Sequence, residues 1–283
     1  MNKVGFIGVG IMGKSMVRNL MKAGFELHIY ARTKSKVEDV IGEGAQFHES
    51  IKDCVQDCDA VITIVGFPQD VEEVYFDEGN ILDSAKEGAY LIDMTTTSPQ
   101  IAEKIYAEGT KRGFHVMDAP VTGGDTGAKA GTLSILVGGE KEDYEACMPL
   151  FEAMGTNINY QGKAGCGQHC KLANQIMIAG TLSGVCEALT YAKEQGLDPE
   201  VFMKSVATGA AGSKQLDTFG PKILKDDYAP GFFMKHFIKD MKLALIEANR
   251  KGLSLDVLSM VLANYEELEQ EGYGDLGTQA LMK

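Results

Sequence analysis

Three glycines near the N-terminus have the spacing of a dinucleotide-binding loop. The segment Gly8-Val9-Gly10-Ile11-Met12-Gly13 follows a β-rich apolar run and opens a helical pattern. The first glycine permits a tight turn, the second lets backbone approach a pyrophosphate, and the third allows close helix–strand packing. Amides at the helix N-terminus attract the phosphates. Three glycines alone also fit a plain turn, but the strand–turn–helix context predicts dinucleotide binding.

The residues after the second apolar run favour NADP over NAD. An NAD-binding unit usually places Asp or Glu roughly 20 residues after the glycines, where it binds the adenosine ribose. Here Arg32, Thr33 and Lys36 lie in a segment, residues 31–36, that has three cations and no carboxylate. A guanidinium and a hydroxyl can hold a ribose 2′-phosphate. A solvated basic loop is the alternative, and we expect NADP, with NAD possible.

A second glycine-containing segment suits an anionic substrate. Thr122, Gly123 and Gly124 come shortly after the strand pattern that ends at Asp118. Loops at the carboxyl ends of parallel strands line the ligand crevice, and successive backbone amides beside a hydroxyl can receive a carboxylate. Taken alone, these residues fit a glycine-rich turn equally well.

Lys171 has the setting of an acid–base residue. It follows Gly165 and Gly167 at the start of a long helical pattern, and Asn174 shares its helix face three residues later. The helix dipole disfavours an ammonium group near the N-terminus, and lysines in partly dry clefts can transfer protons near neutral pH. A lone helical lysine is usually a surface residue, so its place at a predicted domain junction is what favours catalysis.

Cysteine spacing offers two incomplete metal motifs. Cys54 with Cys58, and Cys166 with Cys170, are four residues apart. Zinc ligands usually have tighter spacing and a second, suitably placed pair, so ordinary thiols are favoured and we expect no metal site. Six cysteines in 283 residues are too sparse for a disulfide scaffold, which favours reduced thiols and a cytoplasmic location.

The elements that must position these residues divide the chain in two. Up to about Tyr160, short apolar runs alternate with helical stretches, which predicts an α/β fold: a doubly wound, mostly parallel Rossmann-type sheet with helices on both faces. After Gly162 the patterns become helical. We expect a dinucleotide-binding domain over 1–162 and an all-helical domain over 163–283, joined by a long helix at about 168–195.

Charge and hydropathy exclude some partners. The chain has 27 basic and 40 acidic residues, a net charge of −13, which repels nucleic acids and anionic lipid surfaces. The uncharged run 172–186 is shorter than the roughly 20 apolar residues of a spanning helix. We therefore expect neither nucleic acid nor membrane as a partner. The long apolar helix would be partly exposed in a monomer, which favours a homodimer or homotetramer.

Together these motifs resemble those of the β-hydroxyacid dehydrogenase family, which includes 3-hydroxyisobutyrate dehydrogenase, tartronate semialdehyde reductase and glyoxylate/succinic semialdehyde reductase. The resemblance covers essentially the whole chain and rests on the glycine fingerprint, the segment 118–124, the segment 165–174 and a late Lys239-Asp240 pair. From residue types alone, Lys239-Asp240 is an exposed ion pair and Phe232-Phe233 an aromatic core pair.

The resemblance implies a role for each matched position. Lys171 is implied as the catalytic acid–base, and Asn174 as the residue that positions Lys171 or the substrate hydroxyl. The positions implied to contact substrate are Thr122, Gly123 and Gly124, at the carboxylate, and Phe232, lining the cleft. Thr122 departs from the family's usual serine: its hydroxyl is retained, but its methyl group narrows the carboxylate pocket and puts substrate choice in doubt.

Further positions are implied to contact the cofactor. Thr96 is implied to lie against it, and Lys239 to reach the active site from the helical domain, near the nicotinamide. The border of the nicotinamide nucleotide is implied at Val65, Gly66 and Pro68. The Arg32-Thr33 pair resembles the NADPH-using reductases of the family more than the NAD-using dehydrogenases.

The implied activity is hydride transfer between NADP and a small hydroxy acid/oxo-acid pair, with Lys171 as general acid–base. The related 6-phosphogluconate dehydrogenase needs a much larger helical domain than this chain allows. Imine reductases share the architecture but typically lack a lysine at the position of Lys171. A non-catalytic NADP-binding redox sensor or assembly module is the alternative of a different class.

Overall fold

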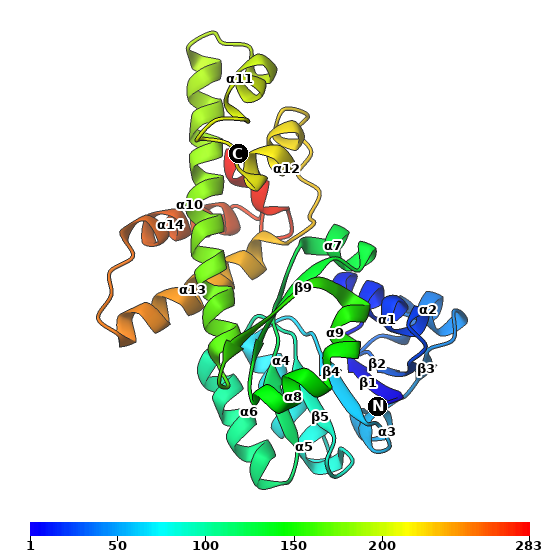
Figure 1. Cartoon of the computed structure of the whole chain (residues 1–283). Coiled ribbons are helices and arrows are strands. Elements are labelled where there is room, and N and C mark those ends of the chain that lie inside the picture. The colour runs from blue at the N-terminus through cyan, green and yellow to red at the C-terminus, as the bar shows by residue number, and fades with distance from the viewer. The chain divides into compact units, whose positions relative to one another are not determined.

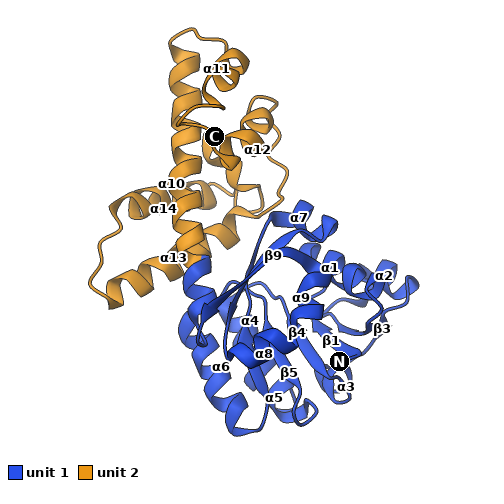
Figure 2. Cartoon of the chain, viewed as in Figure 1, with its two compact units in different colours: residues 1–171 blue, residues 172–283 orange.

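The computed structural model describes residues 1–283, which form two compact units, residues 1–171 and residues 172–283 (Figure 2). The element α10, Cys166–Glu194, is one long helix (Figure 1) that begins in the first unit and continues into the second (Figure 2). The units therefore divide at 171/172, inside a helix, whereas the sequence patterns place the domain boundary at 162/163. The difference arises because the first turn of α10 is hydrogen-bonded to residues of the first unit.

The first unit contains one nine-stranded sheet, mostly parallel as expected. Its strand order is β3-β2-β1-β4-β5-β6-β8-β7, with β9 beside β8, and the first six strands of that path are parallel. β8 is antiparallel to both β6 and β7. The strands are β1 Lys3–Ile7, β2 Glu26–Tyr30, β3 Gln46–Phe47, β4 Ala60–Thr63, β5 Tyr90–Asp93, β6 His115–Asp118, β7 Val121–Thr122, β8 Leu133–Gly138 and β9 Gly155–Gly162.

Alternation along the strands gives this sheet two cores. On β1, Val4 and Phe6 belong to one buried cluster and Ile7 to the other, because successive side chains point to opposite faces. The first cluster includes Met16 of α1 and the second Val71 of α4. The helices of this unit are α1 Ile11–Lys22, η1 Lys34–Lys36, α2 Glu38–Gly42, α3 Ile51–Val55, α4 Pro68–Phe76, α5 Ile81–Ser84, α6 Pro99–Lys111, α7 Gly124–Ala130, α8 Lys141–Ala146 and α9 Met148–Met154.

Two segments of this unit are shaped by a proline and by glycines. The helical pattern over 141–154 forms two helices, divided at Cys147, where α8 ends and α9 begins with Pro149 in its first turn. Proline has no amide hydrogen to continue the preceding helix, which explains the break. The glycine-rich stretch after Thr122 leads directly into a helix, because Gly124 begins α7.

The second unit is all-helical, as predicted. It contains the remainder of α10 with α11 Pro199–Val206, α12 Lys214–Ile223, α13 Met234–Arg250, α14 Asp256–Gln270 and the short η2 Thr278–Met282. By length and composition α10 could span a membrane, but 44% of its apolar window is buried. Its buried residues Leu172 and Ala179 pack with α13 and α14, which makes α10 a core helix.

Candidate active site

The glycine loop between β1 and α1 has the form that a pyrophosphate requires. Gly8 has φ = 98°, and a Cβ there would lie 2.1 Å from the Ile64 carbonyl oxygen. A Cβ at Gly13 would lie 2.1 Å from the Gly8 carbonyl oxygen. A Cβ at Gly10, by contrast, would meet no atom within 4 Å. Gly8 and Gly13 are thus required by the fold itself, and Gly10 leaves open space at the N-terminus of α1.

The N-terminus of α1 has the electrostatic properties of an anion-binding site. Gly10 is the N-cap and supplies no side-chain hydrogen bond, and the first turn of α1 has no acidic residue. The first amides of a helix have no partner within it and carry the positive end of its dipole. The loop therefore fits the diphosphate of a dinucleotide, with Val9, Ile11 and Met12 completing it.

Arg32 lies just beyond β2, on the same side as the glycine loop along the strand direction. Its guanidinium forms an ion pair with Asp70 of α4, and its side chain is 66% exposed. The hydrogen bond with Asp70 raises the pKa of Arg32, so the group stays charged. Thr33 is the N-cap of η1, and Lys36 ends that turn. An anionic ligand at Arg32 would share the guanidinium with Asp70.

A hydrogen-bond network joins the carboxyl ends of β4 and β5. The Thr95 hydroxyl accepts from the Val65 amide at 2.9 Å, and the Thr95 amide donates to Asp93 Oδ1 at 3.1 Å. The Thr63 hydroxyl donates to the same oxygen at 2.8 Å. Burial raises the pKa of Asp93 to about 6, although these hydrogen bonds oppose the rise. The network fixes the segments that carry the expected cofactor residues Val65, Gly66, Pro68 and Thr96.

The start of α10 is bonded to this edge of the sheet. Asp118, at the end of β6, accepts from the Gly165 amide at 2.7 Å and from the Gln168 amide at 2.8 Å. The Gln168 side chain donates to the Thr95 carbonyl at 2.7 Å and accepts from the Thr97 amide at 3.0 Å. One residue thereby connects the helix to the loop between β5 and α6.

Lys171 lies one turn beyond Gln168 on α10. Its residue exposure is 7%, although lysines are almost never fully buried without a partner. Gly167 makes the close approach of this turn possible, because a Cβ there would lie 2.3 Å from the Leu136 carbonyl oxygen. The helix start and its lysine are thus set by contacts with β6 and β8.

The segment expected to hold a carboxylate joins β7 to α7. Thr122 is the last residue of β7 and pairs with Ser134 of β8. Gly123 and Gly124 have φ = 131° and 66°, values that favour glycine. A Cβ at Gly124 would meet no atom within 4 Å, so its surface is open.

The second unit contains its own polar chain. Asn174 donates to the Gln175 side chain at 2.8 Å, and Gln175 donates to Asp240 Oδ2 at 2.6 Å. Lys239 lies 3.0 Å from Asp240 Oδ1, and Asp240 is completely buried. The expectation of an exposed pair at Lys239-Asp240 was wrong, because α13 packs this turn against α10. Two residues that the resemblance implies, Asn174 and Lys239, thus belong to one hydrogen-bonded chain.

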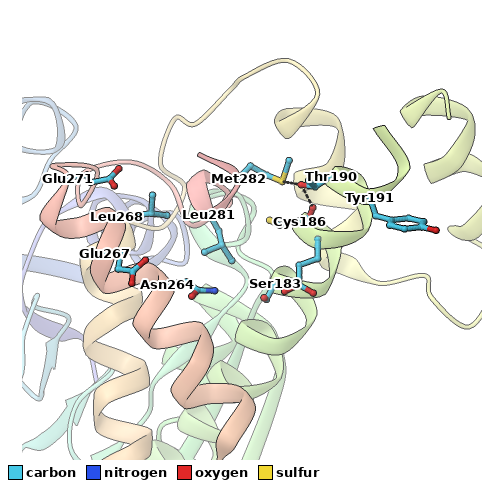
Figure 3. A pocket seen from close by; sticks show the side chains of 11 residues that line it. Ser183, Cys186, Thr190, Tyr191, Asn264, Glu267, Leu268, Glu271, Leu281 and Met282 are labelled. Atoms are coloured by element: carbon cyan, nitrogen blue, oxygen red, sulfur yellow. Dashed lines mark hydrogen bonds between the residues drawn. The ribbon is translucent and has the colours of Figure 1, made fainter. Parts of the chain in front are cut away.

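Phe232 is not a core residue. It is 37% exposed and meets Phe237 edge-on with ring centroids 6.0 Å apart. A groove of about 490 Å³ in this unit, between α10, α14 and η2, is lined by other residues, among them Ser183, Asn264 and Met282 (Figure 3). None of the expected site residues lines it, so it is no part of the candidate active site.

The partners of several residues in these networks were not predicted from the sequence. Gln168 and Gln175 are adjacent in sequence to motif positions. The hydrogen-bond partner of a polar residue on an apolar helix, however, cannot be predicted from its neighbours in the chain. Asp70 stands three residues after Phe67, the spacing of a helix cap, and its carboxylate accepts from the Phe67 amide at 2.9 Å. Asp118 was noted in a motif without its capping role.

The thiols of the Cys54–Cys58 pair are buried and hydrogen-bonded to backbone carbonyls. Cys54 donates to the His28 carbonyl and Cys58 to the Cys54 carbonyl. Burial raises the pKa of both thiols, that of Cys58 to about 12. Both groups therefore remain protonated and uncharged near neutral pH, whereas a metal ligand must be the thiolate.

Comparisons with known proteins agree with this geometry. Residues 3–162 match the NAD-binding domain of 6-phosphogluconate dehydrogenase, and residues 165–283 match the NAD-binding model of NADP-dependent 3-hydroxyisobutyrate dehydrogenase. An uncharacterized oxidoreductase of Bacillus subtilis is 50% identical over 99% of this chain and 97% of its own. A probable mitochondrial 3-hydroxyisobutyrate dehydrogenase-like protein of Arabidopsis thaliana is 44% identical over 99% of this chain and 84% of its own.

A solved structure has the same fold. The 3-hydroxyisobutyrate dehydrogenase of Mycobacterium tuberculosis, with L-serine, superposes with a TM-score of 0.91 at 27% identity, covering 100% of this chain and 98% of that one. These similarities establish an enzyme that acts on CH–OH groups with a nicotinamide dinucleotide, NADP with NAD possible. They do not favour a non-catalytic sensor.

Proposed function

We propose that this chain, which belongs to the β-hydroxyacid dehydrogenase family, is an NADP-preferring reductase of a small oxo-acid such as succinic semialdehyde or glyoxylate. The observation that carries the proposal is the placement of Lys171. It is 7% exposed and lies one turn beyond a residue bonded to the loop that carries Thr96. A proton donor is thereby held at the edge of the sheet where dinucleotides bind in folds of this kind.

The cofactor-binding residues fit a phosphorylated dinucleotide. Gly8, Gly10 and Gly13 would admit the diphosphate, and Arg32 with Thr33 would hold the ribose 2′-phosphate. Lys36 adds a second positive charge to that segment. Val65, Gly66, Pro68 and Thr96 would border the nicotinamide nucleotide. When bound, the nicotinamide supplies or accepts the hydride.

The remaining chemistry is proton transfer and orientation. Lys171 Nζ donates a proton to the substrate's carbonyl oxygen as it becomes a hydroxyl, and takes the proton back in the reverse reaction. Thr122, Gly123 and Gly124 bind the substrate carboxylate and so fix which carbon faces the cofactor. By its resemblance to the family, the chain would use Asn174 to position Lys171 or the hydroxyl, Lys239 as a positive charge for the nicotinamide, and Phe232 as an apolar wall.

The choice among oxo-acids is supported by names of further relatives. Proteins at least 30% identical include a glyoxylate/succinic semialdehyde reductase of Arabidopsis thaliana and a 2-hydroxy-3-oxopropionate reductase of Escherichia coli. Each of these substrates joins a carboxylate to a reactive carbonyl. We further propose that the chain is a cytoplasmic homo-oligomer; its six cysteines are all unpaired, which suits a reducing compartment.

The test is steady-state turnover of NADPH and NADH with succinic semialdehyde and glyoxylate, in the parent protein and in Lys171→Ala. We expect turnover that prefers NADPH and a fall in kcat of about 10²- to 10⁴-fold in the variant, the range for loss of general acid–base catalysis. Lys193→Ala removes an exposed lysine of the same helix and serves as the matched control.

Each part of the proposal has its own contrary result. Faster turnover with NADH would refute the 2′-phosphate role of Arg32 and leave the reductase intact. Lys171→Ala with parental kcat would refute the acid–base assignment. NADPH binding without turnover of any oxo-acid in a wide panel would refute the catalytic function altogether.

A further inference from the structure

We infer that Gln168 is a positioning residue that holds Lys171 in register with the Thr95–Thr97 loop. The inference deepens the proposed function and rests on the assignment of Lys171 as the proton donor. Gln168 falls between the motif glycines and the motif lysine, at a position the family pattern leaves open.

The contacts of Gln168 extend in two directions. Its main-chain amide belongs to α10 and donates to Asp118 at 2.8 Å. Its side chain leaves the helix and spans the loop, donating to the Thr95 carbonyl at 2.7 Å and accepting from the Thr97 amide at 3.0 Å. The whole residue has 0% exposure, so no water competes for these bonds.

The side chain must have both hydrogen-bonding halves of an amide. The loop presents one acceptor, the Thr95 carbonyl, and one donor, the Thr97 amide, and a glutamine matches both at once. A glutamate carboxylate can accept but cannot donate, and a methionine of similar length does neither. Either replacement leaves a buried backbone group unpaired, which is costly.

The same contacts are not needed to cap the helix. Asp118 already satisfies amides of the first turn through Gly165 and Gln168. The side-chain bonds of Gln168 therefore serve the loop rather than the helix end. The loop is fixed from its other side by the bond from the Val65 amide to the Thr95 hydroxyl. Lys171, one turn along, consequently keeps a set distance from the cofactor-binding segments.

The first test is the pH profile of Gln168→Glu. At about pH 8 the introduced carboxylate faces the Thr95 carbonyl without a proton to share, and we expect kcat to fall about 10- to 100-fold, as for a misplaced catalytic group. Burial raises the pKa of such a carboxyl. Towards about pH 5.5 the protonated group can again donate and accept, so the ratio of variant to parent kcat should rise. Gln56→Glu makes the same change at an exposed site and should show a constant ratio.

The second test needs no turnover. In the apo-protein, mass spectrometry measures the rate at which an amine-reactive reagent modifies Lys171. Exposed Lys193 of the same helix is the internal reference. Gln168→Met, which removes both side-chain bonds, should increase modification at Lys171 about tenfold and leave Lys193 unchanged. Equal acceleration at both lysines would show general loosening of α10 and overturn the inference.

The outcomes separate this inference from the proposed function. If the parent turns over, Lys171→Ala does not, and Gln168→Glu matches the parent at every pH, then positioning by Gln168 is refuted and the function stands. If the parent turns over no oxo-acid, the function fails, and unchanged labelling of Lys171 in Gln168→Met would then refute the positioning as well. A fall in kcat with low-pH recovery, together with selective labelling, supports both.

Discussion

At the scale of single residues, the candidate site depends on buried polar groups whose partners are backbone atoms. Asp93 and Asp118 are both buried carboxyls, and each accepts from main-chain amides near the end of a strand. Burial raises the pKa of both, and the amide hydrogen bonds lower it in part. Such groups order loops, but ionising them in a buried site costs stability.

Asp93 should make stability fall as pH rises. Its pKa in the folded protein, about 6, lies above its ordinary value, so the folded state binds the proton more tightly than the unfolded state. Its contribution is therefore fully present below about pH 4 and is lost as pH rises through about 6. Asp93→Asn cannot titrate, so its free energy of unfolding relative to the parent should increase by about 2 to 3 kcal/mol between about pH 4 and pH 8. Urea unfolding followed by circular dichroism measures the difference.

Asp83 supplies a control of opposite sign. The hydrogen bond from Arg112 lowers the pKa of Asp83, so the stability it contributes is present above its ordinary pKa and is lost as pH falls. Asp83→Asn should lose stability relative to the parent as pH rises, by a smaller amount because the pair is exposed. A pH-independent difference for Asp93→Asn would contradict the raised pKa.

At the scale of elements, the loop between β1 and α1 contains one glycine that the fold requires and another that only ligand binding would require. Gly13 is required by the fold, since a Cβ would lie 2.1 Å from the Gly8 carbonyl oxygen. Gly10 is not, because a Cβ there would meet no atom within 4 Å. A glycine is therefore needed at this position only if a ligand fills the space beside Gly10.

Two valine substitutions should therefore behave differently. Gly10→Val should leave the free energy of unfolding within about 0.5 kcal/mol of the parent and weaken NADPH binding about tenfold or more, because its side chain enters the space of the diphosphate. Gly13→Val should destabilise the protein by about 1 to 3 kcal/mol or more through overlap with backbone. Chemical unfolding and NADPH fluorescence titration are the two measurements. Loss of stability in Gly10→Val, with normal binding, would reverse the assignment.

At the scale of the whole molecule, unit 2 has exposed apolar side chains on two neighbouring helices. Met177 of α10 is 74% exposed, and Val257 and Met260 of α14 are 60% and 54% exposed. These helices are neighbours, since a Cβ at Gly180 would lie 3.7 Å from Val257. Exposed apolar side chains on neighbouring helices can mark an association surface, and a second copy of the chain is the partner that we propose.

The mass in solution tests this association. We expect size-exclusion chromatography with light scattering to give a multiple of 30.6 kDa. Met177→Lys places a charge among the apolar side chains and should shift the mass towards that of a single chain, because burying an unpaired charge is costly. Thr110→Lys, an equal change on an exposed position of unit 1, should leave the mass unchanged. A single-chain mass for the parent would refute the homo-oligomer.

The class of fold and the order of the chemical motifs along the chain could be predicted from the sequence. Strands β1, β2, β5 and β6 lie in the part of the chain where short apolar runs alternate with helical stretches, because the interior of a parallel strand that is covered on both faces is mostly apolar. The glycine fingerprint could also be predicted, because the conformational and steric requirements of its glycines are local. These features follow from neighbours in the chain, which a sequence displays directly.

Which polar residues form hydrogen bonds with one another depends on the packing of distant segments. Gln168 lies 71 positions from Thr97, and Gln175 lies 65 positions from Asp240, so no local sequence pattern predicts either hydrogen bond. The same reason underlies the error at Lys239-Asp240: exposure depends on what packs over a helix face, and α10 covers this one. A hydrogen bond between distant segments is specified by the packed fold as a whole, because the chain must first bring its two partners together.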